Sequence, residues 1–307
     1  MATDLGRVML VANPAAQNGR GAQAAEHAAA LLRERLPEGA LTVACTSGPR
    51  HASALAQRAD GCDTIIALGG DGVIHEVANG LMARPASARP MLGVLPVGSG
   101  NDYARSLGMS FKLEQACAQL LDATACPADV GCVNGEWFVE TLSFGLDAAI
   151  ALDTVDRRAR TGRTGTLLYM EAGFDQLMNH LDSFAYELSI DGGEPVRGRS
   201  ITFAVQNGPY YGGGFKVCPD AAIDDGRLSL CIAHPPVSRA KAAYVFLRAK
   251  AGTHTGFKVI EMLTATSLSV SFHPDPPAQI DGERIEGAAF DVALQPGALS
   301  VLMPPRR

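Results

Sequence analysis

Short apolar runs, polar turns and segments of helical periodicity follow one another through the first third of the chain. The runs Val8–Ala12, Leu41–Cys45, Ile65–Leu68 and Met91–Leu95 are each bounded by turn residues, as buried strands are. The helices predicted after them are Ala22–Leu36, His51–Arg58, Val73–Leu81 and Tyr103–Leu107. Strands that alternate with helices at this spacing predict an α/β fold, with a parallel sheet covered by helices on both faces.

The pattern changes near residue 130, where short alternating strands replace the strand–helix units. Turns rich in Asp-Gly and Gly-Gly separate these strands, which is typical of an antiparallel β-sandwich or barrel. The predicted strands are Trp137–Leu142, Phe184–Ile190, Ser200–Gln206, Arg227–Ala233, Ser267–Phe272 and Phe290–Leu294, and the predicted helices are Leu167–Leu181 and Ala240–Lys250. We therefore expect two domains, residues 1–130 and 131–307, with the last strand a candidate to return to the first domain.

Composition and charge narrow the class of protein. Hydrophobic residues make up 47% of the 307 residues and charged residues 19%, which is typical of a globular protein with a sizeable core. The formal net charge of −6 argues against general nucleic-acid binding. Seven cysteines without a C-x-x-C pair favour a reducing cytosol over a disulfide framework. Because no signal peptide and no run of about 18 apolar residues is visible, we expect a cytoplasmic chain that does not span a membrane.

The glycine turn Gly69-Gly70-Asp71-Gly72 joins a predicted strand to a predicted helix. In this geometry the first N–H groups of the helix point towards an anion, and glycine lets the backbone approach a ligand closely. Asp71 is the single side chain in the turn, and a carboxylate beside a phosphate is favourable when a divalent cation lies between them. The alternative interpretation is a tight connection in which Asp71 caps the helix.

Two more polar loops follow predicted strands, one beginning at Asn13-Pro14 and the other spanning Pro96–Asp102. In open α/β sheets the ligand crevice lies beyond the carboxyl ends of the strands, so we expect both loops and the glycine turn to line one edge. No G-x-x-x-x-G-K-[ST] motif is present, which excludes a P-loop protein. The segment Gly98-Ser99-Gly100 matches G-x-G-x-x-G only in part, because Tyr103 holds the last position.

A specific set of motifs appears in order along the chain: N-P, G-G-D-G, P-V-G-S-G-N-D-Y-A-R, Y-Y-G-G-G-F, P-D-A-A-I-D-D-G-R-L and a late D-G-E. Together they resemble the diacylglycerol kinase-like lipid kinases, the superfamily that includes sphingosine kinases and bacterial lipid kinases. NAD kinases and 6-phosphofructokinases are more distant relatives that share the G-G-D-G turn. Two positions depart from the family pattern: Val73 replaces a Thr, and Ser99 replaces the Thr of a Gly-Thr pair. Serine keeps the hydroxyl group, whereas valine cannot donate a hydrogen bond to phosphate.

The resemblance implies a kinase of lipid metabolism that uses ATP and Mg²⁺ and phosphorylates a lipid hydroxyl, such as that of diacylglycerol. The nucleotide would bind to the first domain, and the lipid tails would lie against the second. The implied nucleotide site comprises Asn13, Pro14, Arg20, Gly69, Gly70, Asp71, Gly72, Gly98, Ser99, Asn101 and Asp102. Within it, the backbone amides of the glycine turn would cradle phosphate, and Arg20, in the glycine-containing loop that begins at Asn13, would supply a cation.

Acidic residues at three places complete the implied catalytic centre. Asp71, Asp102 and Asp129 would hold the catalytic Mg²⁺, in part through water, because Mg²⁺ keeps several of its waters. By resemblance, Glu283 in Asp281-Gly282-Glu283 is the base that takes the proton of the acceptor hydroxyl. The alternative for this segment is an ordinary hairpin turn.

A second, structural Mg²⁺ is a further expectation from the resemblance. Its candidate ligands are Asp220 and Asp225, in an acidic loop that also contains Asp224. Some bacterial relatives hold a metal there, although they carry another Asp where this chain has Ser229. The alternative is a solvated turn.

Two basic stretches suggest a membrane partner. The stretch between His234 and Ile260 holds five Lys or Arg residues and no acidic residue, and apolar residues interleave with them. On an acidic protein such a surface indicates docking on anionic lipid, with a solvated helix face as the alternative. The second cluster, within Arg157–Arg163, is expected in a glycine-containing loop, as a lid or a membrane contact. We therefore expect a lipid substrate at a membrane surface, peripheral association and no nucleic-acid partner, and we leave a homodimer open.

Two other functions stay open at this point. The first is phosphorylation of a soluble acceptor, NAD or a sugar, although Y-Y-G-G-G-F and the late D-G-E favour the lipid branch. The second is a non-catalytic lipid or nucleotide sensor that retains the fold, which Val73 favours.

Overall fold

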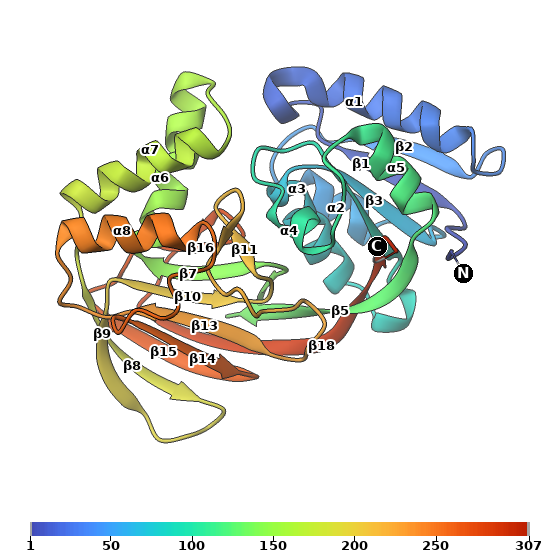
Figure 1. The fold of residues 1–307 in the computed structure, drawn as a ribbon. Coiled ribbons are helices and arrows are strands. Elements are labelled where there is room, and N and C mark those ends of the chain that lie inside the picture. Colours follow the sequence, from blue (N-terminus) through green and yellow to red (C-terminus); the bar gives the residue numbers. More distant parts are fainter. Residues whose placement is uncertain (1, 306–307) are drawn as a thin grey trace. The chain divides into compact units, whose positions relative to one another are not determined.

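The computed structural model describes residues 2–305, and the chain divides into two compact units (Figure 1). Unit 1 comprises Met1–Asp129 and Gly297–Arg307, and unit 2 comprises Val130–Pro296. Strand β18, Ala289–Met303, contributes to both units. It pairs with β15 in unit 2, and its residue Val301 pairs with β4 in unit 1.

Unit 1 contains a parallel sheet with the strand order β2-β1-β3-β4, followed by the end of β18. Its first four strands are β1 (Val8–Ala12), β2 (Leu41–Cys45), β3 (Thr64–Gly69) and β4 (Met91–Pro96). Strand β3 is buried along its whole length, as expected of a central strand in a parallel sheet with both faces covered. The predicted α/β fold of the N-terminal part is therefore confirmed.

Two helix pairs cover this sheet, α1 with α5 and α2 with α3 (Figure 1). The helices of unit 1 are α1 (Ala16–Arg33), α2 (His51–Gln57), α3 (Asp71–Met82), the 3₁₀ turn η1 (Ala86–Ala88), α4 (Asp102–Ser106) and α5 (Leu113–Leu121). The prediction that Arg20 lies in a loop is wrong, because α1 begins at Ala16. Gly21 permits this early start, since a Cβ at that position would collide with the carbonyl oxygen of Asn13.

Unit 2 is a sandwich of two antiparallel sheets, which confirms the predicted fold class of the C-terminal part. One sheet has the order β14-β13-β10-β7-β16-β17, and the other contains β18-β15-β8-β9. The first sheet consists of β7 (Thr141–Gly145), β10 (Thr202–Gln206), β13 (Leu228–Ala233), β14 (Ile260–Ala265), β16 (Ala278–Ile280) and β17 (Glu283–Ile285). The remaining strands are β5 (Thr124–Val133), β6 (Glu136–Phe138), β8 (Phe184–Ile190), β9 (Val196–Ser200), β11 (Tyr210–Tyr211), β12 (Phe215–Lys216) and β15 (Ser267–His273).

The two faces of strand β13 pack against different layers. Leu230 and Ile232 belong to the sandwich core, in which Phe144 contacts the aromatic rings of the facing sheet. Cys231 and Ala233 alternate with them and point to the opposite face, towards a layer of helices. This layer consists of α6 (Leu146–Thr161), α7 (Thr166–Asn179) and α8 (Arg239–Ala249) (Figure 1).

The basic cluster expected in a loop lies mostly on α6 instead. Arg157 forms ion pairs with Asp153, one helical turn earlier, and with Asp175 of α7. Gly162 ends the helix in a left-handed conformation with φ of 66°. A glycine at this position is a common helix terminator, so it marks the C-terminal end of α6. Within residues 2–305, no helix combines the length and the apolarity that a membrane crossing requires.

Candidate functional site

The three polar loops predicted to share an edge do so in unit 1. Strand β3 lies between β1 and β4 in the parallel sheet, so the segments that leave these strands emerge next to one another. The amide of Asn13 donates to the carbonyl of Leu68 over 3.1 Å, and the amide of Val97 donates to the carbonyl of Gly69 over 2.8 Å. These backbone bonds hold both outer loops against the glycine turn.

Glycine allows two of these loops to touch through their backbones. A Cβ built on Gly98 would lie well within 3.0 Å of the Cα of Gly70, closer than real Cβ atoms approach. A Cβ on Gly70 would in turn lie 3.1 Å from the Cα of Gly98. Helix α3 begins at this contact, so its N-terminal N–H groups and its dipole are available to an anion.

Asp71 connects this turn to the next loop. The N-cap of α3 is Gly70 and no side chain accepts a hydrogen bond there, so the alternative interpretation of Asp71 as the cap is wrong. Instead, Oδ1 of Asp71 accepts a hydrogen bond of 3.2 Å from the amide of Tyr103. The Oδ2 atoms of Asp71 and Asp102 both lie against Gly100, whose Cβ would be 2.8 Å and 3.3 Å from them. The structure therefore brings two of the three predicted acidic residues together.

Asn101 fixes the shape of the loop that follows β4. Its backbone is left-handed, with φ of 55° and ψ of 41°, a conformation that asparagine tolerates better than most residues. Its Oδ1 accepts a hydrogen bond of 2.8 Å from the amide of Gly98, and its Nδ2 donates one of 2.9 Å to the carbonyl of Gly98. Ser99 lies between the bonded residues and is partly exposed.

The segment after β1 contacts the Gly98 loop through Gln17, a residue that the sequence analysis missed. Oδ1 of Asn13 accepts a hydrogen bond of 2.9 Å from the amide of Ala15, which forms a turn around Pro14. Gln17 then donates from Nε2 to the carbonyl of Gly98 over 3.3 Å. Arg20 is exposed on α1, so its side chain is accessible to a ligand.

Val73, the departure from the family pattern, packs against the turn that precedes it. A Cβ on Gly69 would lie 2.7 Å from a methyl group of Val73, and Val73 itself is buried. Its side chain therefore fills space beneath the turn. Any phosphate contact at this position would come from the backbone N–H groups.

Asp129, the third predicted acid, is buried and bonded to the backbone. Its Oδ1 accepts a hydrogen bond of 2.7 Å from the amide of Gly297, which joins the middle of β5 to β18. The described part of the chain contains no group of three or more His, Cys, Asp or Glu side chains arranged to hold a metal ion. Asp71 and Asp102 nevertheless supply the oxygen ligands that Mg²⁺ prefers, and phosphate oxygens and water would complete its shell.

The acidic loop of unit 2 forms a turn around Asp225. The Oδ1 of Asp225 accepts a hydrogen bond of 3.0 Å from the amide of Arg227. Across residues 2–305, Asp220 and Asp225 belong to no group of three candidate metal ligands. The structural Mg²⁺ stays a prediction that this geometry does not support.

Glu283, the predicted base, follows a two-residue turn in unit 2. Asp281 and Gly282 have φ angles of 46° and 94° and connect β16 to β17, as in a tight hairpin turn. The side chain of Glu283 is exposed and forms no hydrogen bond or ion pair with the described residues. The hairpin interpretation and the role as a base are therefore compatible, since the turn presents an unpaired carboxylate.

Asp281 holds this turn from the interior of unit 2. Its carboxylate accepts hydrogen bonds from the amides of Val139, Glu140 and Thr141, at 2.8, 3.1 and 2.9 Å. A further bond of 2.6 Å joins the amide of Gly282 to Oε1 of Gln279. The position of Glu283 thus depends on a buried carboxylate two residues away.

Glu140 links the same network to the Y-Y-G-G-G-F hairpin. Its side chain is buried, and its Oε1 accepts a hydrogen bond of 3.2 Å from the amide of Tyr210. Sequence reasoning did not single out Glu140. The signal that points to it is a lone charged residue within the apolar run W-F-V-E-T-L-S-F.

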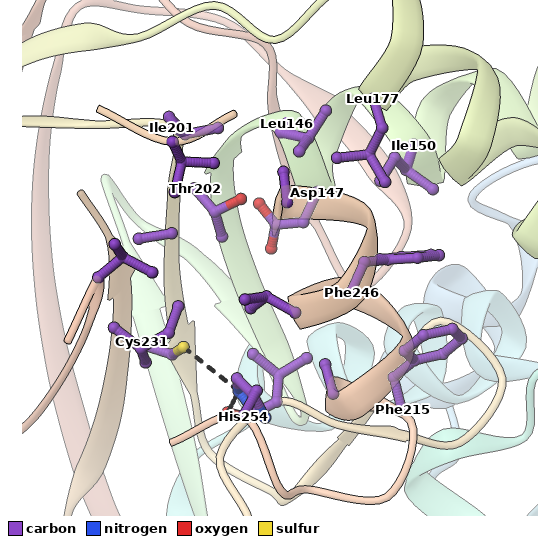
Figure 2. Close-up of a pocket in the computed structure, with 18 of the residues that line it drawn as sticks. Leu146, Asp147, Ile150, Leu177, Ile201, Thr202, Phe215, Cys231, Phe246 and His254 are labelled. Carbon is purple, nitrogen blue, oxygen red and sulfur yellow. Dashed lines mark hydrogen bonds between the residues drawn. The ribbon is translucent and has the colours of Figure 1, made fainter. Parts of the chain in front are cut away.

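An apolar cavity of about 100 Å³ lies inside unit 2, between the helices and the outer face of the sheet that contains β10 and β13 (Figure 2). Its walls include Ile150 of α6, Leu177 of α7 and Phe246 of α8. Phe215 stacks on Phe246 with a centroid distance of 4.9 Å and closes one side. The lining is almost entirely hydrocarbon, which suits an apolar ligand.

Asp147 and His254 are polar residues of the cavity wall that the sequence analysis did not identify (Figure 2). Burial raises the pKa of Asp147 to about 7, and no donor of normal geometry satisfies either of its carboxylate oxygens. His254 lies with Nε2 at 3.1 Å from the carbonyl oxygen of Val217, while Nδ1 has no partner. Burial also lowers the pKa of His254, which favours its neutral form.

Comparison with known proteins confirms the resemblance. The family model for the diacylglycerol kinase catalytic domain matches residues 7–133, and the model for the YegS C-terminal NAD kinase beta sandwich-like domain matches residues 140–303. A protein of Yersinia pestis (strain Pestoides F) named "Probable lipid kinase YegS-like" is 32% identical over 248 residues, which cover 79% of each chain.

Two solved structures share the fold. A diacylglycerol kinase from Bacillus anthracis str. Sterne has a TM-score of 0.81 at 23% identity, over 99% of both chains. An NAD kinase from Archaeoglobus fulgidus in complex with ATP has a TM-score of 0.51 at 13% identity, over 97% of this chain and 93% of that chain. The family models and the Yersinia relative, together with this shared fold, show that the chain belongs to the diacylglycerol kinase-like family of kinases.

Proposed function

We propose that this protein is an ATP-dependent lipid kinase, which transfers the γ-phosphoryl group of ATP to a hydroxyl group of a lipid such as diacylglycerol. The kinase family supports the use of ATP. The apolar cavity of unit 2 carries the choice of a lipid, because its lining is mostly hydrocarbon, which suits a lipid chain better than the many polar groups of NAD or a sugar (Figure 2). The cavity volume is about 100 Å³, and its lining suits part of a hydrocarbon chain.

Unit 1 would bind the nucleotide. The backbone of the Gly69–Gly72 turn and the N-terminus of α3 would cradle phosphate oxygens. Asp71 and Asp102 would hold Mg²⁺, which supplies positive charge to the phosphates when it is bound. Glu283 would accept the proton of the lipid hydroxyl, since its carboxylate is exposed and unpaired.

Incubation with labelled ATP, Mg²⁺ and a total lipid extract tests this function, with NAD and free sugars as alternative acceptors. We expect a labelled lipid, and no label on NAD or sugar. Label on NAD or sugar alone, or no acceptor-dependent consumption of ATP, would contradict the proposal.

Asp71→Asn tests the site itself. The amide oxygen can still accept from Tyr103, while the negative charge beside Asp102 is lost, so lipid phosphorylation should fall by about a hundredfold or more. Asp122→Ala is the control, because Asp122 is exposed at the end of α5 in the same unit and makes no side-chain bond to the described residues. Near wild-type turnover in Asp71→Asn would show that the site is misassigned.

Glu283→Gln separates the chemical step from nucleotide binding. We expect turnover to fall while ATP binding persists, because the carboxylate lies on unit 2 and is assigned only to the proton. Equal loss of both would instead indicate a structural role.

A further inference from the structure

The outward face of α8 carries apolar and basic side chains where a solvated helix would be polar. Phe246 points inward and lines the cavity. On the opposite side, Lys241, Tyr244 and Arg248 follow one another at helical spacing, with Leu247 beside them, and all four are exposed. Tyr244 is 54% exposed and Leu247 is 44% exposed. This combination is typical of a helix that lies at a membrane interface.

A second apolar stripe runs along α7. Leu167, Phe174 and Met178 are spaced by seven and four residues and therefore share one face of the helix. They are 80%, 38% and 52% exposed. The ring of Phe174 lies 6.3 Å from that of Phe246, so this stripe borders α8. Within residues 2–305, six of the eight exposed large hydrophobic side chains lie on α6, α7 or α8, which makes this layer the apolar surface of unit 2.

The charges around the two stripes favour an anionic partner. Between His234 and Ile260 the chain carries five Lys or Arg residues and no acidic residue, although the whole protein has a net charge of −6. The acidic side chains of α7 are ion-paired, since Glu171 and Asp175 both contact Arg157 and Glu171 also contacts Arg163. Within its own segment of the chain, the exposed apolar stripe of α8 is flanked by basic residues and by no acidic one.

We propose that these two stripes dock on a bilayer that contains anionic lipid. The docking surface, called the α7–α8 surface below, consists of Leu167, Phe174, Met178, Lys241, Tyr244, Leu247 and Arg248. Tyr and Leu enter the headgroup region, while Lys and Arg keep their charges at the lipid phosphates. The inference rests on the proposed function only in taking a bilayer as the source of the lipid. Phe246 of α8 lines the cavity (Figure 2), whereas Tyr244 and Leu247 of the same helix are exposed, so a single helix would separate the docked membrane from the cavity.

A second copy of the chain is a less suitable occupant. In a two-fold dimer the same surface of both copies meets, so Lys241 and Arg248 would face like charges across an apolar contact. An anionic bilayer offers the opposite charge to the same side chains.

Co-sedimentation with vesicles tests the proposal. The vesicles are made of phosphatidylcholine alone or of phosphatidylcholine with phosphatidylglycerol. The variants are the pairs Tyr244→Ser with Leu247→Ser, and Lys241→Gln with Arg248→Gln. Val196→Ser is the matched control, because Val196 is 57% exposed on β9 of the same unit but lies outside the α7–α8 surface. All variants change exposed positions, and their circular dichroism should equal that of the wild type.

We expect wild-type protein to prefer the anionic vesicles and to dissociate as salt is raised. Each paired variant should lower the vesicle partition coefficient by about tenfold, and the charge variant should also lose most of the salt dependence. Val196→Ser should bind like the wild type. Equal vesicle binding by all variants would overturn the proposal. So would self-association without vesicles that Tyr244→Ser with Leu247→Ser abolishes, because it would identify a second copy as the occupant.

Activity separates this inference from the proposed function. On a short-chain diacylglycerol dissolved as monomers, the surface variants should turn over like the wild type, whereas on long-chain lipid in vesicles they should be slower. If the wild type binds anionic vesicles through this surface but phosphorylates neither lipid, docking stands and the kinase assignment fails. If it phosphorylates both lipids and the variants match it throughout, the kinase assignment stands and docking fails.

Discussion

Replacing Gly98 with Ala should separate the two loops that form the proposed nucleotide site. The added Cβ would lie 2.6 Å from Oδ1 of Asn101 and closer still to the Cα of Gly70, whereas carbon atoms in contact are about 3.5 Å apart. Because Gly70 presents backbone, no side chain can rotate away, and the loops must part by about 1 Å. Overpacking of this kind costs about 1–3 kcal/mol of unfolding free energy. A shift of about 1 Å in a reacting group can lower the rate about a hundredfold.

Gly48→Ala is the control for this change. Gly48 also lies in a loop of unit 1, but a Cβ there would meet no atom within 4 Å. Urea unfolding and ATP-dependent lipid phosphorylation should be measured for both variants. We expect Gly98→Ala to lose about 1–3 kcal/mol of stability and about a hundredfold in rate, and Gly48→Ala to lose neither. Wild-type stability and rate in Gly98→Ala would refute the close approach of the two loops.

Three further changes test other parts of the structure. Asp281→Ala removes the acceptor of three buried amides, so urea unfolding should show a loss of about 3 kcal/mol or more, and an unchanged midpoint would contradict the network. Asp147→Asn tests the buried acid. The pKa of Asp147 is about 7 in the folded protein and about 3.9 in the unfolded chain. The stability of the wild type should therefore fall relative to the variant as the pH rises from about 4 to about 7, by up to about 4 kcal/mol. A pH-independent difference between the two proteins would show that Asp147 does not titrate in this way. N-ethylmaleimide at neutral pH should label Cys45, which is exposed, and spare Cys231, which is buried and whose pKa burial raises to about 12. Mass spectrometry of the native protein checks this, and prompt labelling of Cys231 would show that the cavity is open to solvent.

The first four strands of unit 1 could be predicted to within one residue because local pattern determines them. A short apolar run bounded by turn residues has few alternatives to a buried strand, as β3 illustrates. The order of these strands in the sheet could not be predicted in the same way. That β3 lies between β1 and β4, which is what brings the loops together, depends on long-range pairing that no local pattern encodes.

Glycine misled the prediction in two places for related reasons. Gly19 and Gly21 suggested a loop around Arg20, yet Gly21 serves close packing against Asn13 within a helix. Gly162, together with the arginines before it, suggested a mobile segment, yet it terminates α6. In both cases glycine meets a steric requirement that the folded structure sets. Its role could therefore not be inferred from its sequence neighbours alone.

The residues that position Glu283 were beyond sequence reasoning altogether. Asp281 reaches amides of Val139–Thr141, which precede it by 140 residues or more, and the turn motif itself is compatible with a solvent-exposed aspartate. The motif D-G-E therefore assigned chemistry to Glu283 and gave no sign of the structural role of Asp281.

The carboxylates of this protein carry structural bonds in addition to the chemistry assigned to them. Asp71 accepts from the amide of Tyr103, Asp129 from the amide of Gly297, and Asp281 from three amides at once. An alanine at any of these positions removes a backbone acceptor together with the charge, and so lowers stability and activity for different reasons at the same time. Asparagine retains one acceptor oxygen while it removes the charge. A loss of turnover in Asp71→Asn without a loss of stability is therefore the result that assigns this carboxylate to the metal–nucleotide site, whereas parallel losses would assign it to the loops.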